Sequence, residues 1–340
     1  MKRSHDMSLK EKLRYTGSLN QLNQVRRVQM LDGPAAGMRL IEVTTESGLY
    51  AVFCEDRALD LYEARYRGTN IGYMCKNGLV PGRIQSVSGT FAAGWPGGML
   101  ATCGLRNTGP DCVIDGEYHP THGRIGGMAA ENVGIWVDEE QGTITITGEM
   151  RESSLGGHHL VMKRRITLST HTSTIDWEDS IQNRATKPEP VFLLYHVNFG
   201  YPFLSPELDL QLPVGEIIPK NEEAEKGLPD YQQISEPIDD KPEHVFFHMQ
   251  LPDSNPQEKV RLIRKDLRIA ASLSWSRREL PWLTEWKMMK AGDYALGIEP
   301  TTSRLRGRAR ELQEGYDQII KPFETWQYHL QLAFESLDNA

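Results

Sequence analysis

The chain has 340 residues, of which 39% are hydrophobic and 25% are charged, a composition typical of a globular protein with a large core. Its formal net charge of −8 argues against binding to nucleic acid, because proteins that bind the phosphate backbone need a cationic surface. The 4 cysteines include no C-x-x-C pair, so they predict neither a disulfide framework nor a thiolate zinc site.

The N-terminal region predicts a short helix and no targeting segment. Ser8 and Glu11 form an S-x-x-E capping box, which marks the start of a helix. No apolar stretch follows the basic start, as a secretory signal would require, and no window approaches the roughly 18 apolar residues of a membrane span. We therefore expect a soluble, cytoplasmic protein with no membrane partner.

Further along the chain, the dominant hydrophobic period is two, the period of half-buried β-strands. Thr143–Thr147 alternates between isoleucine and threonine at every position. The same alternation recurs in four later segments: Leu160–Leu168, Ile175–Ile181, Ile269–Trp275 and Trp326–Phe334. Turn clusters such as Gly94–Gly98 separate strands, and no helices are interleaved with them. The pattern predicts an all-β fold of antiparallel sheets.

One polar stretch, Pro219–Pro242, interrupts the strand pattern and predicts a long surface loop. Strand patterns of one type continue on both sides of it, so we do not interpret it as a domain boundary. The sequence also contains no dinucleotide-binding glycine motif, no P-loop and no H-E-x-x-H zinc motif. These absences remove the main support for a dehydrogenase, a kinase or a zinc protease.

Three polar residues lie in the glycine-rich segment from Tyr118 to Gly127. His119, His122 and Arg124 offer fixed hydrogen-bond donors where glycines permit close approach of a ligand. One interpretation is that these residues bind sugar hydroxyls, and the other is that the segment is a turn with incidental histidines.

A second candidate is the apolar strand Phe192–Gly200, which places His196 and Asn198 on one face by the two-residue repeat. Histidine suits proton transfer because its usual pKa, near 6.5, keeps both forms accessible close to neutrality. The alternative is a hydrogen-bonded core histidine.

The strand Tyr294–Pro300 delivers a carboxylate, Glu299, at its end. A glutamate there is costly unless it is paired or functional, so it is a candidate general base, or the partner of an arginine in Arg304–Arg308. Trp286 and Lys287 form a candidate platform for a sugar ring, against the alternative of a core tryptophan beside a solvated lysine.

A metal site is a further alternative. His119, His122, His196 and Glu299 could supply a three-histidine, one-carboxylate set, although the spacing of the first two is not diagnostic. We predict no metal and no cofactor.

With these residues the chain resembles the aldose 1-epimerase (galactose mutarotase) superfamily, and in particular an uncharacterised aldose 1-epimerase-like branch. The segments that carry the resemblance span nearly the whole chain in order: Gln21–Leu22, Gly98–Asn107, His122–Ile125, Leu194–Gly200, Trp286–Met288 and Gly297–Pro300. The resemblance implies a large antiparallel two-sheet β-sandwich, the galactose mutarotase-like supersandwich. It implies one such domain over residues 1–340, with residues 1–20 as an N-terminal extension that carries the short helix.

The resemblance also implies roles. His196 is similar to the general acid, Glu299 to the general base and His122 to a sugar-contacting histidine; Arg124, Asn198, Trp286, Lys287 and His119 are further candidates for substrate binding. The implied reaction is cofactor-independent ring opening and reclosure of a free monosaccharide, one that is unusual or acidic if Arg124 and Lys287 bind it. A non-catalytic sugar-binding protein and a metal-assisted sugar isomerase remain alternatives, and a homo-oligomer is possible.

Overall fold

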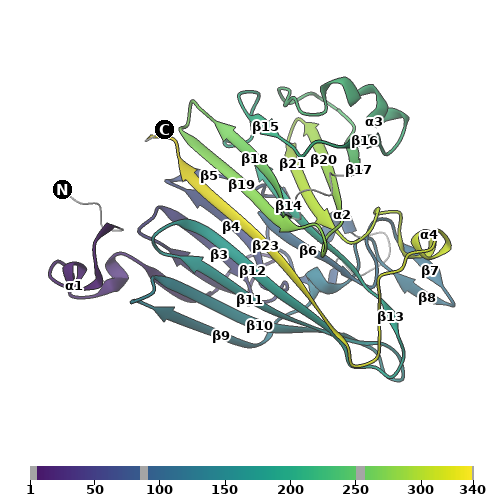
Figure 1. Cartoon of the computed structure of the whole chain (residues 1–340), viewed down its shortest axis with the longest axis horizontal. Helices are drawn as coiled ribbons and strands as arrows, with labels where there is room; N and C mark the ends of the chain where they lie inside the picture. The colour runs from purple at the N-terminus through teal and green to yellow at the C-terminus, as the bar shows by residue number, and fades with distance from the viewer. Residues whose placement is uncertain (1–5, 85–90, 250–256, 339–340) are drawn as a thin grey trace.

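The computed structural model describes residues 6–84, 91–249 and 257–338, and its regular structure is dominated by antiparallel strands (Figure 1). The largest sheet has eight strands in the order β15-β18-β19-β23-β12-β11-β10-β9. Its strands are β9 (Glu131–Asp138), β10 (Thr143–Ser153), β11 (His159–Ser169), β12 (Ser173–Asn183), β15 (Asp209–Gln211), β18 (Gln257–Arg264), β19 (Ile269–Ser276) and β23 (Thr325–Ser336). The four segments with alternating sequence all lie in this sheet, together with Thr143–Thr147.

Two smaller sheets pack against the largest one. The six-stranded sheet has the order β16-β17-β20-β21-β14-β6, and the five-stranded sheet runs from β1 to β5 in order. The six strands are β6 (Leu100–Leu105), β14 (Phe192–Gly200), β16 (Glu216–Pro219), β17 (His244–Met249), β20 (Trp282–Lys290) and β21 (Asp293–Thr301). The five are β1 (Gln24–Gln29), β2 (Arg39–Thr44), β3 (Leu49–Cys54), β4 (Asp60–Tyr66) and β5 (Thr69–Asn70). An isolated bridge between Gly72 and Phe199 joins the two sheets.

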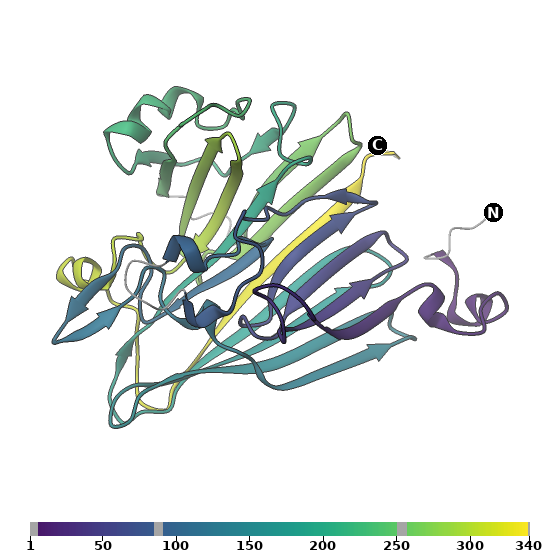
Figure 2. The ribbon, with the colours of Figure 1, turned by 180° about the vertical axis from the view of Figure 1, so that it is seen from behind.

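Together these sheets confirm the predicted antiparallel β-sandwich, which Figure 2 shows from the side of the smaller sheets. One continuous hydrophobic core draws buried side chains from all three sheets, for example Phe53 of β3, Ile166 of β11 and Val197 of β14. The core forms because alternate residues of each strand point to one face, so the period-two pattern turns an apolar face inward.

A buried polar network also crosses this core. Arg164 of β11 donates to the carboxylates of Asp179 and Asp60 and to the hydroxyl of Thr102, and Tyr195 donates to Asp179. These charges are fully paired, as buried charges must be, and the two opposing carboxylates raise the pKa of Arg164 although its burial acts in the other direction. The network fixes β14, the strand that carries His196, against the large sheet.

Short elements complete the fold. The two remaining strand pairs are β7 (Cys112–Ile114) with β8 (Glu117–His119), and β13 (Glu189–Pro190) with β22 (Ile319–Ile320). The α-helices are α1 (Leu9–Lys12), α2 (Phe91–Gly94), α3 (Glu222–Lys226) and α4 (Arg308–Gln313), and single 3₁₀ turns cover Leu19–Gln21, Gly82–Ile84, Ile125–Gly127 and Leu228–Asp230. No helix in the described ranges is long and apolar enough to cross a membrane.

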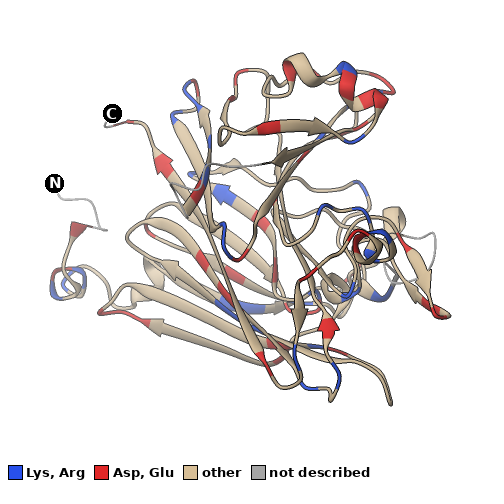
Figure 3. Ribbon diagram, turned by 45° about the vertical axis from the view of Figure 1, so that its right-hand side comes forward, with Lys and Arg blue, Asp and Glu red and all other residues tan. Residues whose placement is uncertain are grey.

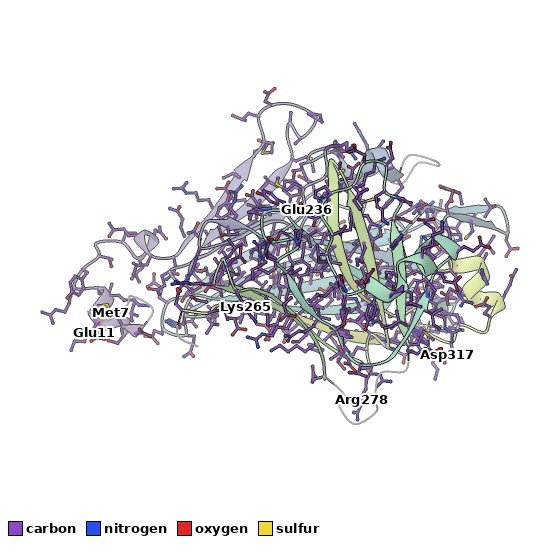
Figure 4. The ribbon with its side chains drawn as sticks, turned by 90° about the horizontal axis from the view of Figure 1, so that it is seen from above. Met7, Glu11, Glu236, Lys265, Arg278 and Asp317 are labelled. Carbon is purple, nitrogen blue, oxygen red and sulfur yellow. The ribbon has the colours of Figure 1, made fainter. Side chains whose placement is uncertain are left out.

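Two sequence predictions concern these short elements. α1 forms as expected, with Ser8 at its N-cap and both hydrogen bonds of the capping box to Glu11 present. Figure 4 places Met7 and Glu11 at one end of the molecule, far from Asp317 at the other. The expected loop Pro219–Pro242 is instead partly helical: Asn221 caps α3 through its side chain, and a 3₁₀ turn follows. Sequence reasoning treated its charged residues as loop-forming and overlooked this N-cap.

Acidic and basic residues are interspersed over the ribbon, with both signs present on the segment that contains α3 (Figure 3).

Candidate active site

The candidate catalytic residues lie in a row across neighbouring strands of the six-stranded sheet. The register pairs Val197 of β14 with Ile298 of β21, which sets His196 opposite Glu299. On the other side of β21, Glu299 pairs with Thr284 of β20, and Thr284 pairs with Phe247 of β17. Side chains directly opposite one another in antiparallel strands share a face, so this row is continuous.

The alternation along β14 decides which face carries the row. Leu193, Tyr195 and Val197 point into the sandwich core, so His196 points to the opposite face of the sheet. Asn198 anchors this part of the strand, because its side-chain amide donates to the carbonyl oxygens of Gly98 and His196.

A cavity of about 670 Å³ covers this face of the sheet. Its volume lies within the range of small-molecule sites in proteins. Its lining combines aromatic, apolar and ionisable side chains, the most relevant being Tyr73, Phe91, Trp95, His122, His196, Lys220, Glu243, Val245, Phe247, Thr284, Trp286, Met288, Asp293 and Glu299.

At the floor of the cavity, Nε2 of His196 lies 3.2 Å from Oε1 of Glu299. Both residues are deeply buried, with exposures of 6% and 2%. Burial lowers the pKa of His196 to about 3, with a further contribution from His122, and burial raises the pKa of Glu299 well above its usual value. Burial therefore disfavours the charged form of both groups.

A glycine creates the space that the carboxyl group of Glu299 occupies. A Cβ atom at Gly297 would lie 2.6 Å from Oε1 of Glu299 and 3.1 Å from Cε1 of His196. The side chain of Glu299 thus folds back over position 297, and only the missing side chain of Gly297 allows the close contact with His196.

Four buried polar atoms of the cavity lining have no hydrogen-bond partner in the structure. They are Nδ1 of His196, Oε1 of Glu299, Oγ1 of Thr284 and Nε1 of Trp95. Most buried polar groups in proteins are hydrogen-bonded, because an unpaired one costs about 1–3 kcal/mol. These four atoms mark the floor of the cavity, around His196 and Glu299, as its polar centre.

Aromatic rings surround the pair of His196 and Glu299. The ring of Trp95 lies 5.2 Å from that of His196 and 5.7 Å from that of Trp286, in the second case edge to face. Phe91 packs on both Trp95 and His122, at 6.1 and 5.3 Å between ring centroids. Such rings present flat apolar faces next to a polar centre.

Two ion pairs belong to the cavity. Lys220 lies 3.3 Å from Glu243, and Lys76 lies 2.7 Å from Asp293. Glu243 also accepts a hydrogen bond of 2.8 Å from Nε1 of Trp286, which fixes the orientation of this indole. Both lysines that line the cavity are thus neutralised by a neighbouring carboxylate.

His122 lines the same cavity, with its ring 6.0 Å from that of His196. Its backbone has a φ of 56°, and burial lowers its pKa to about 4, so its imidazole is neutral. The next residue, Gly123, allows the close approach of two chain segments, because a Cβ there would lie 2.0 Å from the carbonyl oxygen of Gly104.

The other predicted substrate contacts are not part of the lining. Nζ of Lys287 lies on the opposite face of β20, where it donates to the carbonyl oxygens of Asp230, Tyr231 and Gln233. Arg124 donates to the carbonyl of Tyr118. With neither cation lining the cavity, the reason to expect an acidic sugar disappears.

Asn198 and His119 have other surroundings as well. The side-chain amide of Asn198 donates to backbone carbonyls, as described above. The buried His119 lies 3.9 Å from Glu117, and burial and nearby arginines lower the pKa of His119 to about 4. The structure therefore does not bring His119 to the other three members of the hypothetical metal set. Among the described residues, no group of three or more histidine, cysteine, aspartate or glutamate side chains is arranged to hold a metal ion.

Sequence reasoning missed several residues of the cavity. Trp95 lies in the cluster Gly94–Gly98, which was interpreted only as a turn, and Lys220 lies in the predicted loop. Thr284 had a usable signal, because it precedes Trp286 by two residues on one strand and therefore shares its face. Glu243 had no signal, since its position depends on how β17 pairs.

The fold defines the class of this protein as a galactose mutarotase-like β-sandwich, and solved structures agree. A protein from Klebsiella pneumoniae subsp. pneumoniae, provisionally described as an aldose 1-epimerase, superposes with a TM-score of 0.86 at 24% identity, over 93% of this chain and 84% of that one. A galactose mutarotase-like protein from Clostridium acetobutylicum gives 0.67 at 15% identity, over 93% of this chain and 100% of that one.

The galactose 1-epimerase of Lactobacillus acidophilus gives a TM-score of 0.60 at 13% identity, over 92% of this chain and 99% of that one. At such identities the likeness concerns the fold. Residues 35–334 match the model of the DUF4432 family, described as a domain of unknown function, and the chain belongs to this family. No curated protein matches the sequence.

Proposed function

We propose that the protein is a cofactor-independent aldose 1-epimerase, which interconverts the anomers of a free sugar by opening and closing its ring. The observation that carries the proposal is the contact of His196 with Glu299, 3.2 Å apart at the buried floor of a cavity suited to a polyhydroxylated ligand. The fold, shared with proteins described as aldose epimerases, supports the proposal but does not establish the reaction.

Ring opening needs one group that accepts the proton of the anomeric hydroxyl and one that donates a proton to the ring oxygen. The pair of Glu299 and His196, with one proton between them, meets this need. Glu299 takes the proton of the anomeric hydroxyl while His196 protonates the ring oxygen. Rotation about the bond between C1 and C2, followed by reclosure with the roles reversed, gives the other anomer. The proton count of the pair is restored, so no cofactor is consumed.

Burial favours a protonated Glu299 and a neutral His196, so this mechanism requires one proton to pass from Glu299 to His196 when the sugar binds. The two atoms are already 3.2 Å apart, close to hydrogen-bonding distance. Sugar hydroxyls that donate to the carboxylate favour its ionised form. Binding of the sugar thus prepares the charged pair.

The remaining cavity residues bind the sugar in this proposal. Trp286, held in place by Glu243, and Trp95 contact the apolar face of the ring, and neutral His122 exchanges hydrogen bonds with hydroxyls. The hydroxyl of Thr284, next to Glu299 in the register, is a fourth polar contact.

Saturation-transfer NMR across a panel of hexoses, pentoses, deoxy-sugars, uronic acids and reducing disaccharides tests the proposal. We expect the protein to accelerate anomer exchange of at least one neutral sugar, and Glu299→Gln and His196→Ala each to abolish the acceleration. The exposed pair of His329 and Glu279, whose atoms lie 3.0 Å apart on another part of the molecule, provides matched controls. His329→Ala and Glu279→Gln should leave the exchange unchanged.

No acceleration with any sugar would refute the proposal. If sugars still bound, the result would support a non-catalytic sugar-binding protein on this scaffold. Equal loss of exchange in the control variants would show that the substitutions act through the fold and not through the chemistry.

A further inference from the structure

The floor of the cavity extends well beyond the catalytic pair. It crosses four neighbouring strands: His196 comes from β14, Glu299 from β21, Thr284 from β20 and Phe247 from β17. Neighbouring strands lie about 4.8 Å apart, so this row of residues spans roughly 14 Å.

A single sugar ring is smaller than this floor. With covalent bonds of about 1.4 to 1.5 Å, a pyranose and its hydroxyl oxygens measure roughly 5 to 6 Å across. A ring with its anomeric carbon at His196 and Glu299 therefore ends near Thr284. The volume of the cavity supports the same conclusion. About 670 Å³ is the volume of roughly 20 water molecules, whereas a hexose has about 12 non-hydrogen atoms and so fills only part of it.

The unused part of the floor is apolar and lies over β17. Phe247 is half-buried and faces Thr284, while Val245 faces Trp286 in the next row of the register. Both side chains line the cavity beside Trp286. A second sugar ring would pack its C–H face against them, as the first ring does against the indole.

Polar groups border this apolar area. Lys220 and Glu243 both line the cavity, and their side chains are 46% and 43% exposed, so their free donor and acceptor positions remain accessible. Because the two charges neutralise each other, this border suits hydroxyl groups better than a phosphate or a carboxylate.

We propose that the cavity has a second sugar subsite over β17, formed by Phe247, Val245, Lys220 and Glu243, and that the substrate is a neutral reducing disaccharide. Its reducing ring lies at His196 and Glu299, and its second ring lies on Phe247 with hydroxyls bound to Lys220 and Glu243. The inference rests on the proposed function, because that function places the reducing end at the catalytic pair.

The experiment measures binding without turnover, by calorimetry on the Glu299→Gln variant. The ligands are glucose and galactose, compared with the reducing disaccharides maltose, cellobiose, lactose and galactobiose. We expect at least one disaccharide to bind 10-fold or more tightly than the monosaccharide at its reducing end. Adding Phe247→Ala should bring this ratio close to one. Adding Phe323→Ala, an equal truncation at a residue that is 66% exposed and outside the cavity lining, should preserve the ratio.

The inference is wrong if no disaccharide binds more tightly than glucose or galactose, including the case in which none binds. It is also wrong if the preference survives Phe247→Ala. Failure of the proposed function is distinguishable, because it shows as an absence of anomer exchange by the unsubstituted protein while the preference for a disaccharide persists.

Discussion

Gly297→Ala is a sharp test of the candidate active site, because it adds one methyl group at the point where Glu299 folds back. The added Cβ would lie 2.6 Å from Oε1 of Glu299, and an ordinary contact begins near 3.4 Å, so the carboxyl oxygen must withdraw by about 0.8 Å. It also has to avoid Cε1 of His196, which the Cβ would approach to 3.1 Å. The contact between Glu299 and His196 is therefore disturbed while both proposed catalytic residues remain.

The expected effect on the rate follows from this displacement. A misplacement of about 1 Å can reduce an enzymatic rate by roughly 100-fold, so we expect kcat/KM for anomer exchange to fall by about that factor. The effect on stability should be modest, because the closest atom is the end of a flexible side chain and Gly297 has no positive φ. Cβ of Trp286, which the added Cβ would approach to 3.2 Å, has to give by only a few tenths of an ångström. Replacing glycine by alanine in a compatible conformation stabilises a protein by about 0.4–1 kcal/mol, which offsets the local crowding.

The assay combines anomer exchange by NMR with chemical denaturation of the same samples. Gly17→Ala is the matched control, since a Cβ at Gly17 meets no atom within 4 Å and should change neither quantity by much. Glu299→Asp, with its shorter side chain, should cost less activity in the Gly297→Ala background than in the unsubstituted protein, because the clash is already relieved. Unchanged turnover in Gly297→Ala would refute the role given to the contact between Glu299 and His196.

Thr284→Val, which replaces the hydroxyl by a methyl group, should reduce kcat/KM by about 2- to 12-fold, the effect of losing one net hydrogen bond. Thr284→Ser should retain activity, and equal losses in both variants would contradict a hydroxyl contact. Buried Glu152 has its pKa raised to about 7, so the folded state keeps a proton that the unfolded state loses, and stability falls as the pH rises from about 4.5 through 7. Glu152→Gln should remove this loss and be more stable than the unsubstituted protein by roughly 3 kcal/mol at pH 8 but not at pH 4, as urea denaturation would show. Lys287→Met should lower the free energy of unfolding by about 1–3 kcal/mol, because three partly buried hydrogen bonds to backbone carbonyls lose their common donor, and an unaltered urea midpoint would count against that role. For anomer exchange, activity on the acidic side should be lost only when His196 takes up a second proton for the pair, near its pKa of about 3. A rate that falls to half on the acidic side near pH 6.5 would instead indicate an unburied imidazole.

The residue pattern by itself determined the fold class and which strand residues share a face. Alternation such as that of Thr143–Thr147 is a local property, since the geometry of an extended chain sends successive side chains to opposite sides. The same rule separates His196 from the core residues on either side of it. Applied to Trp286 and Lys287, it also says that two consecutive residues of one strand cannot both face one cavity, which the sequence interpretation overlooked.

Only the tertiary structure decided which distant residues meet. His196 contacts Glu299 because β14 pairs with β21, and Glu243 reaches Trp286 because β17 pairs with β20. Pairing of this kind joins residues far apart in the chain, and the local sequence of a strand does not name its partner. The surroundings of Lys287 likewise depend on where the segment around Tyr231 packs. Residue types and their alternation are local, whereas strand order, burial and the resulting pKa values are properties of the assembled sheets.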